Sequence, residues 1–137
     1  MNHHEETRIL VADNDEDVLI ALEGALEERG YATTVALSSA EVCALLDKGG
    51  FDLLILDDYL SDADSVKTLT ACRSAGIRTL VVVTYHRFPP VDEAARLRDL
   101  GVSALVNKRS HSELIEIVGH LLKPQMGGDR WRLGSIT

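Results

Sequence analysis

Short, nearly continuous runs of apolar residues alternate along the chain with longer segments in which apolar residues recur every three to four positions. The runs show little polar–apolar alternation, which is typical of strands buried on both faces of a sheet. The longer segments each carry one apolar stripe, which is typical of helices packed against a sheet. The predicted strands span residues 8–12, 31–37, 51–57, 79–84 and 102–107.

A predicted helix follows each predicted strand, and short sequence signals mark the helix ends. Ser38 with Glu41, and Ser110 with Glu113, have the spacing of a capping box, in which the two side chains satisfy the first free backbone N–H groups of a helix. Glycine closes several of these segments, as is common at helix C-termini. The first helix is expected over residues 15–29, and the second from Ser38 to near Gly49–Gly50. The third has about ten residues and ends at Gly76, the fourth follows Pro90 and ends near Gly101, and the last runs from Ser110 to about Leu122.

This succession of strand–helix pairs predicts an α/β fold with a parallel sheet covered by helices on both faces. Residues 1–123 are expected to form one domain. Residues 124–137 contain Pro124 and the pair Gly127–Gly128, which discourage regular structure, so a C-terminal tail or the start of a linker is expected. Two interpretations of Trp131 stay open, an anchor for this tail and an exposed side chain.

Composition adds limits on the class of protein. The chain has 137 residues, of which 45% are hydrophobic and 26% charged, as in a soluble globular domain. A net charge of −8 argues against direct nucleic acid binding, which needs a basic face. Neither a signal peptide nor an apolar run of about 18 residues is present, so a cytoplasmic protein without membrane contact is predicted. Cys43 and Cys72 are interpreted as small buried hydrophobic residues in a reducing compartment.

Polar residues gather where four of the predicted strands end, which is where parallel α/β sheets bind ligands. Clustered carboxylates repel one another unless a cation lies between them, and Mg²⁺ prefers such oxygen ligands. A carboxylate can attack phosphorus to form an acyl phosphate, while a hydroxyl and an ammonium neutralise the phosphoryl oxygens. The cluster therefore predicts a phosphoryl acceptor. Its members are Asp13, Asn14, Asp15, Asp57, Asp58, Thr84 and Lys108.

The segments RILVADND, LLILDDYL, VVVTYH and ALVNK together resemble the receiver domain of two-component response regulators, over about residues 7 to 122. The resemblance implies a flavodoxin-like, doubly wound sheet of five parallel strands in the order 2-1-3-4-5. It implies that Asp57, the last residue of the third strand, accepts the phosphoryl group, and that Thr84 and Lys108 contact that group. It also implies a Mg²⁺ site formed by Asp13, Asn14, Asp57 and the backbone carbonyl of Tyr59.

Four residues depart from the pattern of this family. Asn14 stands where receivers place a second acid, so weaker Mg²⁺ binding is expected. Asp15 is a candidate to compensate for it, although a neighbouring residue on an extended strand points the other way. Tyr85 follows Thr84 where a small residue is usual, and its phenol either obstructs small phosphodonors or points outward. Leu105 replaces the aromatic residue whose rotation reports phosphorylation. Arg109 replaces a cis proline, so a trans peptide bond is expected.

Other residues near the acceptor have roles that the sequence leaves more open. Tyr59 and His86 match positions that govern hydrolysis of the acyl phosphate, and both are bulky, so slow self-dephosphorylation is expected. Asp58 is interpreted as a solvated loop residue, with a metal ligand as the alternative. Asp62 and Asp64 are interpreted as loop and helix-capping acids. Ser61 and Ser65 replace the proline and glycine that are usual in this loop.

The leading hypothesis is a signalling switch that takes a phosphoryl group from a histidine kinase or phosphotransfer protein and then acts on a downstream protein target. Apart from self-phosphorylation and slow autodephosphorylation, no enzyme activity is expected. The alternative is a pseudo-receiver that binds proteins without phosphorylation. Part of the last helix, with Leu97 and Leu105, is a candidate partner or homodimer surface. A flavin or nucleotide enzyme is set aside because DNDED (residues 13–17) is acidic where a phosphate loop needs glycines.

Overall fold

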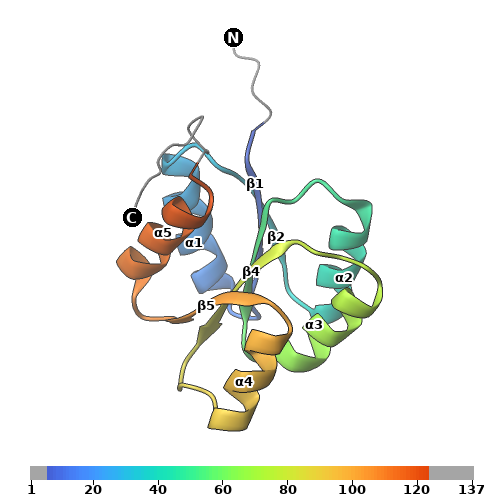
Figure 1. The fold of residues 1–137 in the computed structure, drawn as a ribbon. Helices are drawn as coiled ribbons and strands as arrows, with labels where there is room; N and C mark the ends of the chain where they lie inside the picture. Colours follow the sequence, from blue (N-terminus) through green and yellow to red (C-terminus); the bar gives the residue numbers. More distant parts are fainter. Residues whose placement is uncertain (1–5, 124–137) are drawn as a thin grey trace, which may run out of the picture.

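Five parallel strands form a single sheet in the order β2-β1-β3-β4-β5 in the computed structural model, which describes residues 6–123. This confirms the predicted flavodoxin-like topology (Figure 1). The reversal of strand order lies between β1 and β3, and the carboxyl ends of these two central strands carry the acidic residues. The strands are β1 (Arg8–Ala12), β2 (Ala32–Ala36), β3 (Leu53–Asp57), β4 (Leu80–Tyr85) and β5 (Val102–Asn107).

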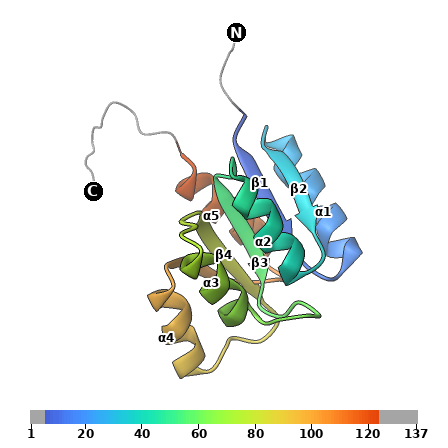
Figure 2. The same ribbon diagram turned by 90° about the vertical axis from the view of Figure 1, so that its right-hand side faces the viewer.

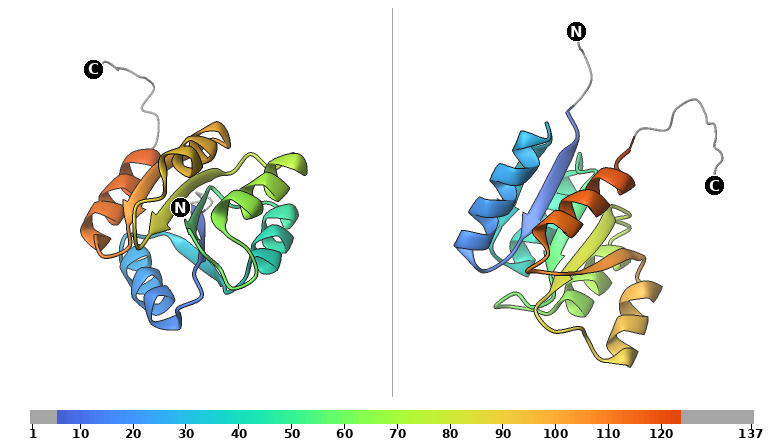
Figure 3. Two further views of the ribbon diagram at one scale, coloured as in Figure 1. Left: turned by 90° about the horizontal axis from the view of Figure 1, so that it is seen from below. Right: turned by 90° about the vertical axis from the view of Figure 1, so that its left-hand side faces the viewer.

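Two hydrophobic layers enclose the sheet, one on each face. Helices α1 (Glu16–Glu28) and α5 (His111–Leu121) cover one face, whereas α2 (Ser39–Lys48), α3 (Ser65–Ser74) and α4 (Val91–Asp99) cover the other (Figures 2 and 3). Alternate residues of each central strand supply the two layers, which is why their sequence is apolar without interruption. Every residue of β3 is buried.

The helix N-termini are capped as predicted at three of the four positions that the sequence pointed to. The Ser38 hydroxyl accepts a hydrogen bond from the Glu41 backbone N–H at 3.1 Å, and Asp64 caps α3 by accepting from the Lys67 N–H at 2.8 Å. Asp62 reaches across to a different helix and accepts from the N–H groups of Ser39 and Ala40 at the start of α2. These backbone hydrogen bonds lower the pKa of the Asp62 carboxyl.

The second predicted capping box is wrong. The Ser110 side chain makes no capping hydrogen bond to α5, because Ser110 has φ −99° and ψ 65° and so lacks the extended backbone that directs a cap side chain toward the helix. Its backbone N–H instead donates to the Asn107 carbonyl in the turn that follows β5. Among the described helices, none is long and apolar enough to cross a membrane. Trp131 and the predicted tail at 124–137 lie outside the described residues.

Candidate phosphoryl-acceptor site

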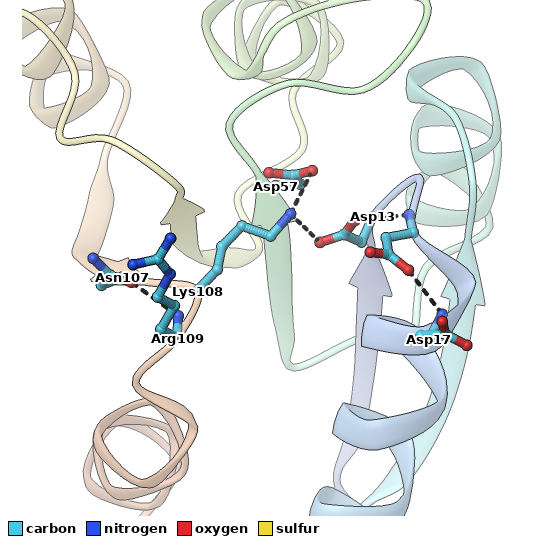
Figure 4. A network of polar contacts seen from close by, with 7 residues as sticks. Asp13, Asp17, Asp57, Asn107, Lys108 and Arg109 are labelled. Atoms are coloured by element: carbon cyan, nitrogen blue, oxygen red, sulfur yellow. Dashed lines mark hydrogen bonds and ion pairs between the residues drawn. The ribbon is translucent and has the colours of Figure 1, made fainter.

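Two buried carboxylates and one ammonium group meet at the carboxyl ends of the strands (Figure 4). The Lys108 Nζ lies 3.0 Å from Asp13 Oδ2 and 3.2 Å from Asp57 Oδ2, so it bridges the two acids. Asp13 is 2% exposed and Asp57 is 5% exposed, whereas the Lys108 side chain is 20% exposed. The fold therefore brings Asp13, Asp57 and Lys108, which lie 44 to 95 positions apart in the sequence, into one charged cluster that partly faces solvent.

Sheet register brings these side chains together. Asp57 is the last residue of β3 and pairs in register with Thr84 on β4, while Asp13 directly follows β1. Thr84 is buried, at 4% exposure. Lys108 directly follows β5, and its backbone N–H donates to the Tyr85 carbonyl at 2.9 Å. Adjacent parallel strands end at one edge of the sheet, so the chain positions all four residues through backbone geometry.

A turn after β5 holds Lys108 in this position. The Asn107 side-chain oxygen accepts a hydrogen bond from the Arg109 backbone N–H at 2.9 Å, which is the two-residue pattern of an Asx turn. The peptide bonds of the described residues are all trans, as predicted for the bond before Arg109. Sequence reasoning missed this role of Asn107, although an asparagine at a strand end is itself a recognisable turn signal.

Burial sets the electrostatics of Asp57. Desolvation, followed by repulsion from Asp13, raises the pKa of Asp57 from its ordinary value of 3.8 to about 6, and the Lys108 charge opposes this only in part. Burial disfavours the Lys108 ammonium, but its contacts with Asp13 and Asp57 outweigh burial and raise the pKa of Lys108. At neutral pH the cluster thus holds two carboxylates and one ammonium, with excess negative charge that favours a cation.

A cavity of about 400 Å³ opens beside Asp57. Two cationic side chains line the cavity: Arg87 from the loop after β4 and Lys108 from the loop after β5. Arg87 was not singled out by the sequence, since nothing in its neighbourhood distinguishes it from any exposed arginine. The lining residues are Asn14, Asp57, Asp58, Tyr59, His86, Arg87 and Lys108.

The prediction that Asp58 is a solvated loop residue is wrong, because Asp58 is only 4% exposed. Its carboxylate accepts a hydrogen bond of 2.6 Å from the hydroxyl of Ser65, a residue with no exposed surface. The backbone holds it in place as well, since the Asp58 N–H donates to the Thr84 carbonyl and the Asp58 carbonyl accepts from the Ser65 N–H, both at 2.8 Å. Ser65 therefore supplies the hydrogen-bond donor that a buried carboxylate needs. This role can be recognised only in the tertiary structure.

Replacing Ser65 with alanine is expected to lower the free energy of unfolding by about 1–3 kcal/mol, because the buried Asp58 carboxylate would lose its hydroxyl donor. Urea denaturation at pH 7.5 measures this change. Ser61 lies exposed in the same loop, so Ser61→Ala is the matched control and should change stability little. Equal effects of the two substitutions would contradict the assigned role of Ser65.

The residues that depart from the family pattern occupy distinct places around the site. Asn14 is exposed and lines the cavity. Asp15 does not reach the cluster as a ligand, because its carboxylate caps α1 by accepting from the Asp17 N–H at 2.9 Å, as expected for a side chain that points away from Asp57. Its own backbone N–H donates to Asp13 Oδ1 at 2.9 Å and so fixes that carboxylate.

Tyr85 points toward the loop after β4. Its ring packs edge-to-face against Phe88, with centroids 5.3 Å apart and an interplanar angle of 83°, and it does not line the cavity beside Asp57. Leu105 is half-buried and lines a separate cavity of about 260 Å³ between α4 and β5, together with Phe88 and Leu97. Leu97 has no exposed surface, so the expectation that it contributes to an exposed partner surface is wrong.

The donors near Asp57 suit a small hard cation. Carboxylate oxygens of Asp13 and Asp57, the Asn14 amide and the Tyr59 backbone carbonyl are all oxygen donors, which Mg²⁺ prefers. Within residues 6–123, no three His, Cys, Asp or Glu side chains are grouped so as to hold a metal by themselves. A bound Mg²⁺ would therefore need the amide, the backbone carbonyl and water to complete its coordination shell, which is common for this ion.

The chain is similar in sequence to known transcriptional regulatory proteins. The chain is 31% identical to the transcriptional regulatory protein PrrA of Mycobacterium tuberculosis over 116 residues, which cover 85% of this chain and 50% of PrrA. It is 33% identical to the alginate biosynthesis transcriptional regulatory protein AlgB of Pseudomonas aeruginosa over 109 residues, which cover 78% of this chain and 24% of AlgB. The chain thus spans half the length of PrrA and about a quarter of AlgB.

A solved structure shares the fold. The signal receiver domain of a putative LuxO repressor protein from Vibrio parahaemolyticus superposes with a TM-score of 0.79 at 20% identity, covering 87% of this chain and 92% of that domain. The model of the response regulator receiver domain matches residues 9–119, which include every element from β1 to α5 almost in full. The chain therefore belongs to the response regulator receiver family.

Proposed function

We propose that this receiver domain accepts a phosphoryl group on Asp57 from a histidine kinase or phosphotransfer protein, with Mg²⁺, and thereby switches a protein-interaction surface. One observation carries the proposal: two buried carboxylates, Asp13 and Asp57, share the Lys108 ammonium beside a cavity of about 400 Å³. Burying such a cluster is costly for stability, so its retention favours a chemical role.

In the proposed reaction, a carboxylate oxygen of Asp57 attacks the phosphorus of a phosphohistidine. The new O–P bond forms as the P–N bond breaks, and the electron pair of that bond stays on the imidazole nitrogen of the donor. The Lys108 ammonium moves toward the negatively charged phosphoryl group, and the neighbouring Thr84 hydroxyl donates a hydrogen bond to a phosphoryl oxygen. When bound, Mg²⁺ would neutralise charge on the phosphoryl oxygens. Asp13, Asn14, Asp57 and the Tyr59 carbonyl are the residues proposed to hold it.

The proposed switch follows from the position of Lys108 and Thr84. Both belong to chain segments that continue into the α4, β5 and α5 region, so moving them toward a phosphoryl group shifts the equilibrium between conformations of that region. A downstream protein would bind one conformation better than the other. The same region is the surface that we propose for a homodimer.

The test is the mass of the intact protein after incubation with Mg²⁺ and a small phosphodonor or a cognate kinase. We expect the wild type to gain the mass of one phosphoryl group and Asp57→Ala to gain none. Asp47→Asn, at an exposed position on α2, is the matched control and should behave as the wild type. Because Tyr85 packs against Phe88 and does not line the cavity beside Asp57, it should not block a small donor.

The second candidate function is a pseudo-receiver that binds partners without phosphorylation. The observation that favours it is Asn14, which lines the cavity beside Asp57 with an uncharged amide where receivers place a second acid. This alternative replaces the first if no donor adds mass and the protein has no measurable Mg²⁺ affinity.

Side chains at the cavity bear on the lifetime of an acyl phosphate. Tyr59 and His86 are exposed and line the cavity beside Asp57, where they can shield the phosphoryl group from water. We therefore expect Tyr59→Ala and His86→Ala to hydrolyse the aspartyl phosphate several-fold faster than the wild type, measured as loss of the phosphoryl mass with time. His120→Ala, exposed on α5, should not change the rate. A wild-type half-life of seconds would contradict the shielding role.

A further inference from the structure

The two cysteines of the chain face each other across two neighbouring helices. Cys43 lies on α2 and Cys72 on α3, and their sulfur atoms are 3.6 Å apart although both thiols are free. Cys72 is 1% exposed and so confirms the prediction of a buried residue, whereas Cys43 remains partly exposed at the edge of the core. A disulfide needs the sulfurs at about 2.05 Å, so the two sulfur atoms must come about 1.5 Å closer together.

Burial gives the two thiols different reactivity. Desolvation, reinforced by the neighbouring Cys43, raises the pKa of Cys72 to about 12, so Cys72 stays protonated at neutral pH. At 1% exposure, Cys72 is also shielded from soluble oxidants. Cys43 reaches the surface and is therefore the residue that an oxidant meets first.

We propose that Cys43 and Cys72 form a redox-sensitive pair, which a peroxide converts into a reversible disulfide between α2 and α3. A position next to a resolving thiol is the arrangement that cysteine redox sensors use. Intracellular disulfides in ordinary cells are mostly of this transient, regulatory kind.

The chemistry takes two steps and one equivalent of hydrogen peroxide. The Cys43 sulfur attacks one peroxide oxygen, the O–O bond breaks, and Cys43 becomes a sulfenic acid while the released oxygen leaves as water. The Cys72 sulfur then attacks the Cys43 sulfur, the S–O bond breaks, and the Cys72 proton leaves with the hydroxide as a second water. The two thiols lose two electrons in total and the peroxide gains them.

The disulfide would act on the segment that contains the acceptor. The two cysteines are 29 positions apart, and the chain between them includes β3, Asp57 and the loop to α3. That loop is already tied to α2 through Asp62, which accepts hydrogen bonds from Ser39 and Ala40. Closing a loop of this length restricts the unfolded chain, so the oxidised protein should melt on the order of 10 °C higher.

The experiment is oxidation of the native protein with a small excess of hydrogen peroxide, followed by alkylation in denaturant and intact mass measurement. Because the chain has only two cysteines, the count of alkylated thiols is unambiguous. We expect the count to fall from two to none in monomeric protein, the Tm to rise, and dithiothreitol to reverse both changes. Peptide mapping should recover Cys43 linked to Cys72.

Two variants separate the roles of the thiols. In Cys72→Ala, Cys43 should be trapped as a sulfenic acid by dimedone, with no rise in Tm. In Cys43→Ala, Cys72 should remain a free thiol under the same treatment. The proposal is overturned if wild-type Cys43 is oxidised to a sulfinic acid while Cys72 stays alkylatable, or if the disulfide joins two chains. These readouts do not depend on whether Asp57 accepts a phosphoryl group.

Discussion

Replacing Lys108 with methionine is expected to lower the free energy of unfolding by about 3 kcal/mol at pH 8, because it leaves two buried carboxylates without their shared cation. The Lys108 Nζ contacts Asp13 at 3.0 Å and Asp57 at 3.2 Å, and both acids are at most 5% exposed. Methionine preserves most of the side-chain volume, so the change in the free energy of unfolding reflects the loss of charge more than a loss of packing. Urea denaturation in metal-free buffer measures it.

The pH dependence of this loss identifies its cause. Asp57 has a pKa of about 6 in the folded protein, so acidification below that value neutralises one of the two carboxylates and should shrink the effect of Lys108→Met. The double variant Asp57→Asn, Lys108→Met should likewise lose less stability than Lys108→Met alone. Lys67→Met, at an exposed position on α3, is the control. A loss that is the same at pH 5 and pH 8 would point to packing instead of charge.

Replacing Asp57 with asparagine should stabilise the protein at pH 7.5 in metal-free buffer, by about 1–3 kcal/mol. The folded-state pKa of Asp57 is raised from 3.8 to about 6, first by burial and then by Asp13. Between these two values the unfolded chain has already released the Asp57 proton while the folded protein still holds it. Stability of the wild type therefore falls as the pH rises from about 4 to about 6, and the full penalty is present above that range.

Asparagine removes this penalty because its amide stays neutral and can still accept a hydrogen bond from Lys108. Lys108 also keeps its contact with Asp13, so the variant leaves no unpaired buried cation. The stability difference between Asp57→Asn and the wild type should shrink as the pH falls toward 4 and disappear below about pH 3, where Asp57 is protonated in both states. Asp47→Asn should show no such pH dependence. A destabilising effect of Asp57→Asn at pH 7.5 would show that the carboxylate is held by favourable contacts that outweigh its desolvation.

Local sequence patterns were sufficient to predict the fold. Apolar runs without alternation placed the inner strands β1, β3 and β4 to within about two residues, because a strand covered on both faces has no solvent-facing positions. The edge strands β2 and β5, which are mostly half-buried, were placed to within about one residue. The same logic located the candidate site, because polar residues mark the strand ends. Asp13, Asp57 and Thr84 are the first polar residues after their runs and Lys108 is the second after its run, and the structure brings these residues together at one edge of the sheet.

Side-chain partners were harder to predict, because they depend on residues far apart in the chain. Ser110 and Glu113 have the same spacing as Ser38 and Glu41, yet only the first turn of α2 uses the serine as a cap. The backbone torsions of Ser110 are set by the turn that positions Lys108, and no pattern within four residues reports that constraint. Asp62 likewise caps a helix 22 residues earlier in the chain.

The sequence by itself thus determined the strand and helix order and the parallel sheet, because these follow from periodicity. The candidate acceptor followed from the polar cluster at the strand ends together with the resemblance to receiver domains. Only the tertiary structure decided that Asp58 is buried and accepts a hydrogen bond from Ser65. The same holds for the Lys108 bridge between Asp13 and Asp57, and for the contact between Cys43 and Cys72. These contacts join segments that are neighbours only after the sheet and helices have packed. Their energies depend on burial, which each side chain acquires from the whole fold.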